Sequence, residues 1–283
     1  MGVLVYGSEI SEEIRNGLKE QIEGLKGTGR RVPCLAVILV GNNPASLSYI
    51  KGKEKACAAV GMDSRMFHLE ETASRDEVIK VIEDCNKDDG IDGILVQLPL
   101  PKGLNEKEIL VHIDPAKDVD GLHPVNVGKL YLGEDGFRPC TPLGIMEILK
   151  RMNCDPDGKR AVVIGRSALV GAPVARLLQD QGATVTIAHS HTKDLAGLCR
   201  EADILIAAIG RPRYIGAEYI KEGAFVVDVG INRDENGKLC GDVDTAAVLD
   251  HVTAVTPVPK GVGPMTICML LVNTMKSYET RNV

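Results

Sequence analysis

Short apolar runs alternate with amphipathic segments along the first third of the chain. Residues 34–40, 64–69 and 92–100 form apolar runs of strand length, whereas residues 10–26 and 74–87 repeat apolar side chains at the spacing of one helix face. A further helix is expected over residues 46–60, ending at Gly61. Strands that alternate with helices in this way predict an α/β domain with a largely parallel sheet.

The same alternation returns in the second half of the chain. Strands are predicted over residues 160–165, 183–190, 202–210 and 224–230, and a long final helix over residues 263–279. Residues 112–144, between the two series, are rich in Pro and Gly and indicate a domain boundary. The pattern therefore predicts two α/β domains.

Composition narrows the class of protein. The 283 residues exceed one typical domain, and 44% hydrophobic with 25% charged residues is usual for a soluble globular protein. The apolar runs are too short to span a membrane, and the N-terminus lacks the features of a signal peptide, so we expect a cytoplasmic protein. A net charge of -6 does not suit a nucleic-acid-binding surface.

Cysteine and histidine spacing gives no sign of a disulfide framework or a metal site. The eight cysteines are scattered without paired spacing, and we expect reduced core or surface thiols. Among the six histidines only His189 and His191 lie close together, with no cysteine beside them. No metal is expected.

The turn at residues 165–171 is the clearest cofactor signal. Gly165 would permit a sharp turn after a strand, Gly171 would permit close packing of helix on strand, and the helix N-terminus would offer free N–H groups to a pyrophosphate. Gly182 is placed to end that helix. A plain strand-turn-helix connection could carry the same residues, so the turn alone leaves both interpretations open.

The end of the next predicted strand indicates which dinucleotide would bind. An NAD site would place Asp or Glu there for the ribose 2'-hydroxyl, but the segment reads His189, Ser190, His191. A Ser190 hydroxyl, with Arg166 from the glycine turn, would suit a 2'-phosphate, which favours NADP over NAD. Alternatively, Ser190 would be the N-cap of the following helix.

Three lysines lie close together on the helix predicted over residues 46–60. At 100° per residue, Lys53 shares the apolar side with Tyr49 and Cys57, whereas Lys51 and Lys55 point elsewhere. Lys53 could extend its amine from that face into solvent. It could instead be desolvated, with a lowered pKa that makes its neutral form available for acid/base chemistry.

Further motifs carry a family resemblance. Gln97 lies at the carboxyl end of an apolar strand, where open α/β sheets bind ligands. The motifs, in order along nearly the whole chain, are S-x-x-Y-x-x-x-K at 46–53, V-Q-L-P-L-P at 96–101, K-D-V-D-G at 117–121, P-C-T-P-x-G at 139–144, G-R-S-x-x-V-G-x-P at 165–173 and D-x-G-I-N at 228–232. With these motifs the chain resembles the bifunctional methylenetetrahydrofolate dehydrogenase/cyclohydrolases.

The resemblance implies an organisation and two reactions. A folate-binding catalytic α/β domain would comprise residues 1–120 plus the C-terminal helix 264–283, and a Rossmann-like NADP-binding domain residues 140–260, with a cleft between them. The enzyme would oxidise 5,10-methylenetetrahydrofolate with NADP and hydrolyse the methenyl product to 10-formyltetrahydrofolate. It would be a homodimer.

The resemblance also implies roles for particular residues. Lys53 would be the central acid/base, hydrogen-bonded by Gln97, Tyr49 would stack on the folate, and Asp120 would bind the pterin, whose adjacent donors suit a carboxylate. Further substrate contacts would be Leu98, Pro99 and Gly263, and cofactor contacts would be Gly165, Arg166, Ser167, Ser190, Ile231 and Thr266. Asp118, by contrast, is interpreted as a turn cap.

One departure and two alternatives remain. Lys260 stands where the family's P-V-P-G-G-V-G-P-M-T motif has its first glycine, and a positive φ there would strain the loop by about 1 kcal/mol or more. Another Rossmann NADP dehydrogenase would need its own base and gives no reason for Gln97 and Asp120. A non-catalytic NADP- or folate-binding protein is the second alternative, and an intact Lys53 counts against it.

Overall fold

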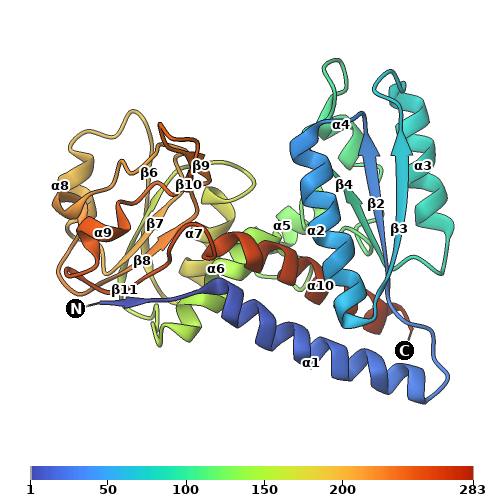
Figure 1. The fold of residues 1–283 in the computed structure, drawn as a ribbon, viewed down its shortest axis with the longest axis horizontal. Helices are drawn as coiled ribbons and strands as arrows, with labels where there is room; N and C mark the ends of the chain where they lie inside the picture. The colour runs from blue at the N-terminus through green and yellow to red at the C-terminus, as the bar shows by residue number, and fades with distance from the viewer. Residues whose placement is uncertain (1, 283) are drawn as a thin grey trace. The chain divides into compact units, whose positions relative to one another are not determined.

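The computed structural model describes residues 2–282, apart from the side chain of Ala45. The chain forms two compact units, one made of the chain up to Glu12 with residues 141–266, the other of residues 13–140 with 267–283. Each unit contains a parallel sheet with helices (Figure 1). Two α/β units were predicted from the alternating pattern, and this is confirmed.

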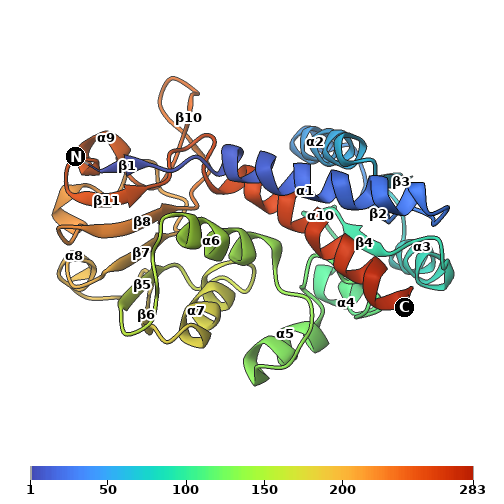
Figure 2. The ribbon, with the colours of Figure 1, turned by 90° about the horizontal axis from the view of Figure 1, so that it is seen from below.

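The unit built on residues 13–140 has a three-stranded parallel sheet in the order β3 (Asp63–Leu69), β2 (Cys34–Val40), β4 (Gly93–Val96). Every residue of the central strand β2 is buried, as its continuous apolar run predicts. Helices α2 (Pro44–Val60) and α3 (Arg75–Lys87) pack against the sheet (Figures 1 and 2). Shorter helices are α4 (Glu106–Leu110) and α5 (Pro124–Leu132).

The other unit has a six-stranded parallel sheet. Its strands, in spatial order, are β1 (Val3–Leu4), β11 (Val252–Val255), β8 (Ala224–Asp228), β7 (Ile204–Ala207), β5 (Arg160–Ile164) and β6 (Thr184–Ala188). A small hairpin pairs β9 (Asn232–Arg233) with β10 (Leu239–Cys240). The helices wholly within this unit are α7 (Gly171–Asp180), α8 (Leu195–Cys199), η1 (Ala217–Tyr219) and α9 (Thr245–Val248).

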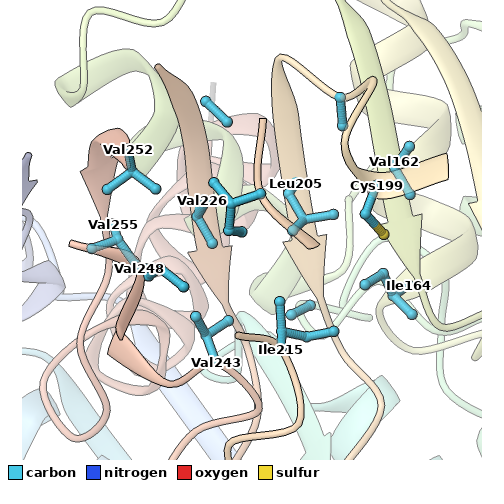
Figure 3. Packing of buried hydrophobic residues seen from close by; sticks show 14 of the residues in the cluster. Val162, Ile164, Cys199, Leu205, Ile215, Val226, Val243, Val248, Val252 and Val255 are labelled. Atoms are coloured by element: carbon cyan, nitrogen blue, oxygen red, sulfur yellow. The ribbon is translucent and has the colours of Figure 1, made fainter. Parts of the chain in front are cut away.

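Hydrophobic packing holds this sheet together. Helix α7 packs against β5 and β6 (Figure 2). Figure 3 shows part of the buried cluster in this unit, to which Leu205, Val226 and Val243 contribute. Removing such side chains from water is the main stabilising term for a fold of this kind. The resulting rigid sheet gives fixed positions to the loops that leave its carboxyl edge.

Three helices contain residues at or across the division between the units. They are α1 (Gly7–Gly27), α6 (Cys140–Arg151) and α10 (Val262–Arg281). The long helices predicted over residues 10–26 and 263–279 correspond to α1 and α10. Among the described residues, no helix has the length and apolar character needed to cross a membrane.

The first strand is one element that the pattern did not predict. β1 pairs in parallel with β11, with Val3 opposite Ala254. The N-terminal residues therefore join the six-stranded sheet, although the predicted catalytic domain began at residue 1. Two residues are too few to show a period along the sequence, so only pairing with a distant strand identifies this element.

Lys260 adopts a positive φ of 81°, the conformation on which the expected strain depends. We expect Lys260→Gly to raise the free energy of unfolding by about 0.5–1 kcal/mol, because relief of the left-handed strain exceeds the entropy that glycine adds to the unfolded chain. Denaturant unfolding monitored by circular dichroism would measure this. The control is Lys193→Gly. Lys193 is an exposed loop residue and is not among the described residues with a positive φ, so glycine there should lower the free energy of unfolding. A less stable Lys260→Gly protein would contradict the strain.

Candidate active site

Helix α2 buries one of its three lysines. Lys53 is only 7% exposed, whereas Lys51 and Lys55 are exposed. Tyr49, one turn earlier, is 40% exposed. The helical-face prediction is confirmed, because the lysine that shares its face with Cys57 is the buried one. An amine removed from water in this way needs a polar partner.

Gln97, the residue directly after β4, provides that partner. The Lys53 Nζ donates a hydrogen bond to Gln97 Oε1 at 2.8 Å. The Gln97 Nε2 donates to the Leu98 carbonyl at 2.7 Å, and its backbone N–H donates to Ile38 at 2.8 Å. These bonds fix the amide so that its oxygen faces the amine. Gln97 therefore lies at the carboxyl edge of the sheet, as predicted.

The burial of Lys53 favours proton transfer. Burial lowers the pKa of Lys53, and the nearby Asp120 charge partly offsets that effect. Burial likewise raises the pKa of the Asp120 carboxyl, and Lys53 opposes that shift. The Lys53 Nζ also lies 5.8 Å from the centroid of the Tyr49 ring. A lysine with a lowered pKa can exchange a proton nearer neutral pH than an ordinary lysine.

The loop that carries Asp120 is anchored by its two neighbours in the K-D-V-D-G motif. The buried Lys117 amine donates to three carbonyls at the end of α3, those of Cys85, Asn86 and Asp88. Asp118 accepts hydrogen bonds from the His123 N–H and the Asn126 amide, both at 2.8 Å. Asp118 thus caps the following turn, as its interpretation predicted.

Glycine is required directly after Asp120. Gly121 has φ 70°, and a side chain there would collide with the Arg138 backbone. With Lys117 and Asp118 both engaged in structural bonds, Asp120 is the acid of this motif that interacts with Lys53.

Cys140 is a further residue beside Asp120, and it was not predicted from the sequence. Its thiol lies 3.3 Å from the Val119 carbonyl and within hydrogen-bonding reach of the Asp120 carboxyl, and its one proton can be donated to only one of them at a time. Burial first, and then the Asp120 charge, raise the pKa of the Cys140 thiol well above its usual value. The thiol therefore stays neutral and can donate to the carboxylate. Its place in P-C-T-P-x-G was the available signal.

All eight cysteines, Cys140 included, are buried free thiols. Within residues 2–282, no cluster of His, Cys, Asp and Glu side chains could hold a metal ion.

The glycine turn of the other unit lies between β5 and α7. Gly165 has φ 124°, and a side chain there would collide with the Ala208 carbonyl. A side chain at Gly171 would collide with the Gly165 carbonyl. Both glycines are therefore needed for the close approach of strand, turn and helix. Gly182 follows α7 with φ 82°, in agreement with its predicted role at the helix end.

Ser167 has a local partner in this turn. Its hydroxyl accepts hydrogen bonds from the Val170 N–H at 3.2 Å and the Gly171 N–H at 3.4 Å. It therefore stabilises the start of α7. The N–H of Gly165 is also engaged, with the Ala188 carbonyl at 2.9 Å.

Arg166 and Ser190 lie at one edge of the sheet. Ile164 and Ala188, the last residues of β5 and β6, lie opposite each other in the sheet. Arg166 and Ser190 each follow two positions after the end of their strand. Both residues are exposed. The N-cap of α8 is Asp194, whose carboxylate accepts the Gly197 N–H, so the alternative role for Ser190 as helix cap is wrong. No acid occupies the end of β6, and this arrangement fits a 2'-phosphate.

The remaining predicted site residues lie on loops or helix starts. Ile231 is 60% exposed after β8. The Thr266 hydroxyl lies 2.9 Å from that of Thr141, and a side chain at Gly263 would meet open space. Leu98 is half-buried and Pro99 is exposed, directly after Gln97.

Two family models match the chain. The catalytic-domain model of tetrahydrofolate dehydrogenase/cyclohydrolase matches residues 5–120, and its NAD(P)-binding domain model matches residues 139–282. The bifunctional protein FolD of Staphylococcus carnosus (strain TM300) is 54% identical over 278 residues, covering 98% of this chain and 97% of that protein. The FolD of Oceanobacillus iheyensis is 53% identical over 282 residues, covering 100% and 99%.

Solved structures agree with these matches. The bifunctional FolD of Campylobacter jejuni has a TM-score of 0.97 at 50% identity, covering 99% of this chain and 100% of that one. The methylenetetrahydrofolate dehydrogenase-cyclohydrolase of Trypanosoma brucei, solved with NADP and an inhibitor, has a TM-score of 0.93 at 36% identity, covering 99% and 98%. The chain, with its Lys53–Gln97 pair and its glycine turn, belongs to the tetrahydrofolate dehydrogenase/cyclohydrolase family.

Proposed function

We propose that this chain catalyses two successive reactions of one-carbon metabolism. It oxidises 5,10-methylenetetrahydrofolate to 5,10-methenyltetrahydrofolate with NADP, and it hydrolyses the methenyl compound to 10-formyltetrahydrofolate. The family assignment over both halves supports both activities. The observation that carries the proposal is the buried Lys53 amine, bonded to Gln97 at 2.8 Å and electrostatically coupled to Asp120.

In the hydrolysis, Lys53 moves protons. Water attacks the cationic methenyl carbon, and the neutral Lys53 amine accepts the proton that the water loses. The bond from that carbon to N5 then breaks as Lys53 returns a proton to N5. The hydroxyl formed from water loses its remaining proton to solvent, which leaves the formyl group on N10. Gln97 holds the amine in place, Asp120 accepts hydrogen bonds from the pterin, and Tyr49 stacks on the folate.

In the oxidation, the task of the protein is alignment. Bound NADP would supply the acceptor for the hydride of the methylene carbon. The folate nitrogens stabilise the resulting cation, so no protein base is needed for this step. Tyr49 and Asp120 orient the folate, whereas the turn from Gly165 to Gly171 supports the pyrophosphate and Arg166 with Ser190 binds the 2'-phosphate. Ile231 and Thr266 provide further cofactor contacts.

A direct assay tests the function. Purified protein with methylenetetrahydrofolate and NADP should reduce the nicotinamide, and the protein with methenyltetrahydrofolate alone should hydrolyse it. Absence of both activities would indicate a non-catalytic NADP- or folate-binding protein. Nicotinamide reduction with a hydroxy or amino acid, but not with the folate, would indicate another Rossmann dehydrogenase.

Three further aspects belong to the same proposal. The unit that holds Lys53 binds folate, and the unit with the six-stranded sheet binds NADP. The enzyme is cytoplasmic, because eight free cysteines suit a reducing compartment. It is a homodimer, by resemblance to its family. Light scattering after size exclusion measures the mass, and a monomer would reject that last part.

Arg166→Ala should reduce the discrimination between NADP and NAD. We expect the affinity for NADP to be about tenfold weaker and the affinity for NAD to change little. This loss lies at the lower end of the range for a charge-assisted hydrogen bond because Arg166 is exposed. Cofactor titration of the purified protein measures both affinities. The control is Arg160→Ala, at the opposite end of β5, and it should change neither affinity. Equal losses for NADP and NAD in Arg166→Ala would show that this side chain does not bind the 2'-phosphate.

A further inference from the structure

Two carboxylates are completely buried in the unit with the six-stranded sheet. Asp228 ends β8, Asp242 follows β10, and both are 0% exposed. Asp228 accepts three backbone hydrogen bonds at 2.9 Å, from the N–H groups of Gly230, Asp242 and Val243. Val243 packs its own side chain into the hydrophobic cluster of Figure 3. Asp228 therefore ties the segment around Asp242 to the end of a core strand.

Asp242 in turn holds two other segments. Its Oδ2 accepts the N–H groups of Ile209 at 2.7 Å and Gly210 at 3.1 Å. Its Oδ1 accepts the Arg211 N–H and the Asn232 amide, both at 2.8 Å. The first three partners belong to the loop after β7, and Asn232 to the segment after β8. One side chain therefore fixes both loops.

Two glycines make room for this arrangement. A side chain at Gly230 would collide with the Asp242 carboxyl, and a side chain at Gly241 would collide with the Asp228 carboxyl. Burying two carboxylates is costly unless hydrogen bonds satisfy them. Here backbone N–H groups and the Asn232 amide supply those bonds. Glycine at positions 230 and 241 leaves space for the two carboxyl groups.

The two loops leave the sheet at its ligand-binding edge. β7 and β8 are neighbours, with Ala207 opposite Asp228 in register. Open α/β sheets bind ligands outside the carboxyl ends of their strands. The loop after β7 begins at Ala208, whose carbonyl lies against Gly165 of the glycine turn. Ile231 is 60% exposed. Its two neighbours in the chain are held by hydrogen bonds, Gly230 to Asp228 and Asn232 to Asp242.

We infer that Asp242 is a positioning residue for NADP, holding the loop at 208–211 and the segment around Ile231 in the conformation that receives the cofactor. This inference rests on the proposed NADP-dependent function. The Asp242 carboxyl makes its hydrogen bonds within the protein, so it acts on NADP binding through the two loops. Without it, the loops would have to become ordered when NADP binds, and affinity would fall.

Asp242 is a better test than Asp228. Burial raises the pKa of Asp228 to about 7, against the effect of its three N–H donors, so a substitution there would mix charge with geometry at neutral pH. Asp242→Asn keeps the shape but replaces one acceptor oxygen by an amide that faces N–H donors.

The experiment compares two identical substitutions two residues apart. Asp244 is the N-cap of α9, where its carboxylate accepts the Ala247 N–H at 3.3 Å, and Asn is an equally good cap. We expect Asp242→Asn to raise the dissociation constant of NADP roughly 10- to 100-fold, as for loss of charge-assisted bonds. Asp244→Asn should not change it. Hydrolysis of methenyltetrahydrofolate without NADP should stay within about twofold of the unsubstituted protein in both variants.

The other results have distinct meanings. An unchanged NADP affinity in Asp242→Asn would overturn the inference, and so would tighter binding, which would indicate simple charge repulsion. Equal losses of NADP affinity and hydrolysis would also overturn it, because they would show a general structural role. An unsubstituted protein without NADP-dependent activity would instead reject the proposed function.

A milder variant covers the case in which Asp242→Asn fails to fold. Asn232→Ala removes only one donor to Asp242 and leaves its three backbone bonds. It should weaken NADP severalfold and retain hydrolysis. Unchanged NADP affinity in this folded variant would overturn the inference.

Discussion

Replacing Lys53 with Met should lower the hydrolysis of methenyltetrahydrofolate about 10²-fold or more, the usual contribution of a general acid/base. Met keeps much of the length and apolar packing of the buried side chain but has no titratable amine. Hydride transfer needs no proton step once the cation can form, so the oxidation of methylenetetrahydrofolate should fall less. Steady-state assays of both reactions on the same preparation measure the difference.

The neighbouring lysines are matched controls. Lys51→Met and Lys55→Met change exposed side chains of the same helix, and both activities should remain nearly intact. If all three variants behaved alike, or if Lys53→Met hydrolysed its substrate normally, Lys53 would be a packed side chain without a role in proton transfer.

Asp120→Asn should lower folate affinity or turnover roughly 10- to 100-fold, because an amide presents donors to the pterin's donors where the carboxylate presented acceptors. NADP affinity should be retained. Substrate titrations in both reactions and direct cofactor binding measure these effects. Asp114→Asn is the control, since Asp114 is an exposed turn cap of the same loop that accepts the Ala116 N–H at 2.9 Å. Unchanged folate kinetics in Asp120→Asn would remove Asp120 from the site.

The same variant should also change the pH dependence. The Asp120 charge raises the pKa of Lys53 against the larger lowering effect of burial. Removing that charge should lower the Lys53 pKa further, so the neutral amine would persist to lower pH. The ascending limb of kcat/KM for hydrolysis should therefore move to lower pH in Asp120→Asn. A shift to higher pH would contradict the electrostatic coupling of the two residues.

Most regular elements could be predicted from the sequence because their signal is local. The apolar run 34–40 became the fully buried β2, and the helix predicted over residues 74–87 became α3, with Ser74 as its N-cap. The buried face of α2 was also predictable, since the angle between Lys53 and Lys51 on a helix depends only on their separation. The strand predicted over residues 92–100 ends at Val96, because Pro99 and Pro101 cannot continue a ladder.

The site was predictable where a motif keeps its residues close together. Gln97 ends a strand, and the edge at which parallel strands end follows from the fold class. The preference for NADP followed from the lack of an acid after β6, which is again a local feature. Cys140 was missed because its contact with Asp120 joins residues 20 positions apart across a loop whose path the sequence does not show.

The sequence by itself determined the α/β class, the two-domain organisation, the face of Lys53 and the family. Only the tertiary structure decided which strand β1 joins, that Lys117 caps α3, and that Asp228 and Asp242 satisfy their carboxylates with the backbone of distant loops. The physical reason is the range of the interactions. Periodicity and turn chemistry act over a few residues, whereas a buried charge takes whichever donors the complete fold brings to it.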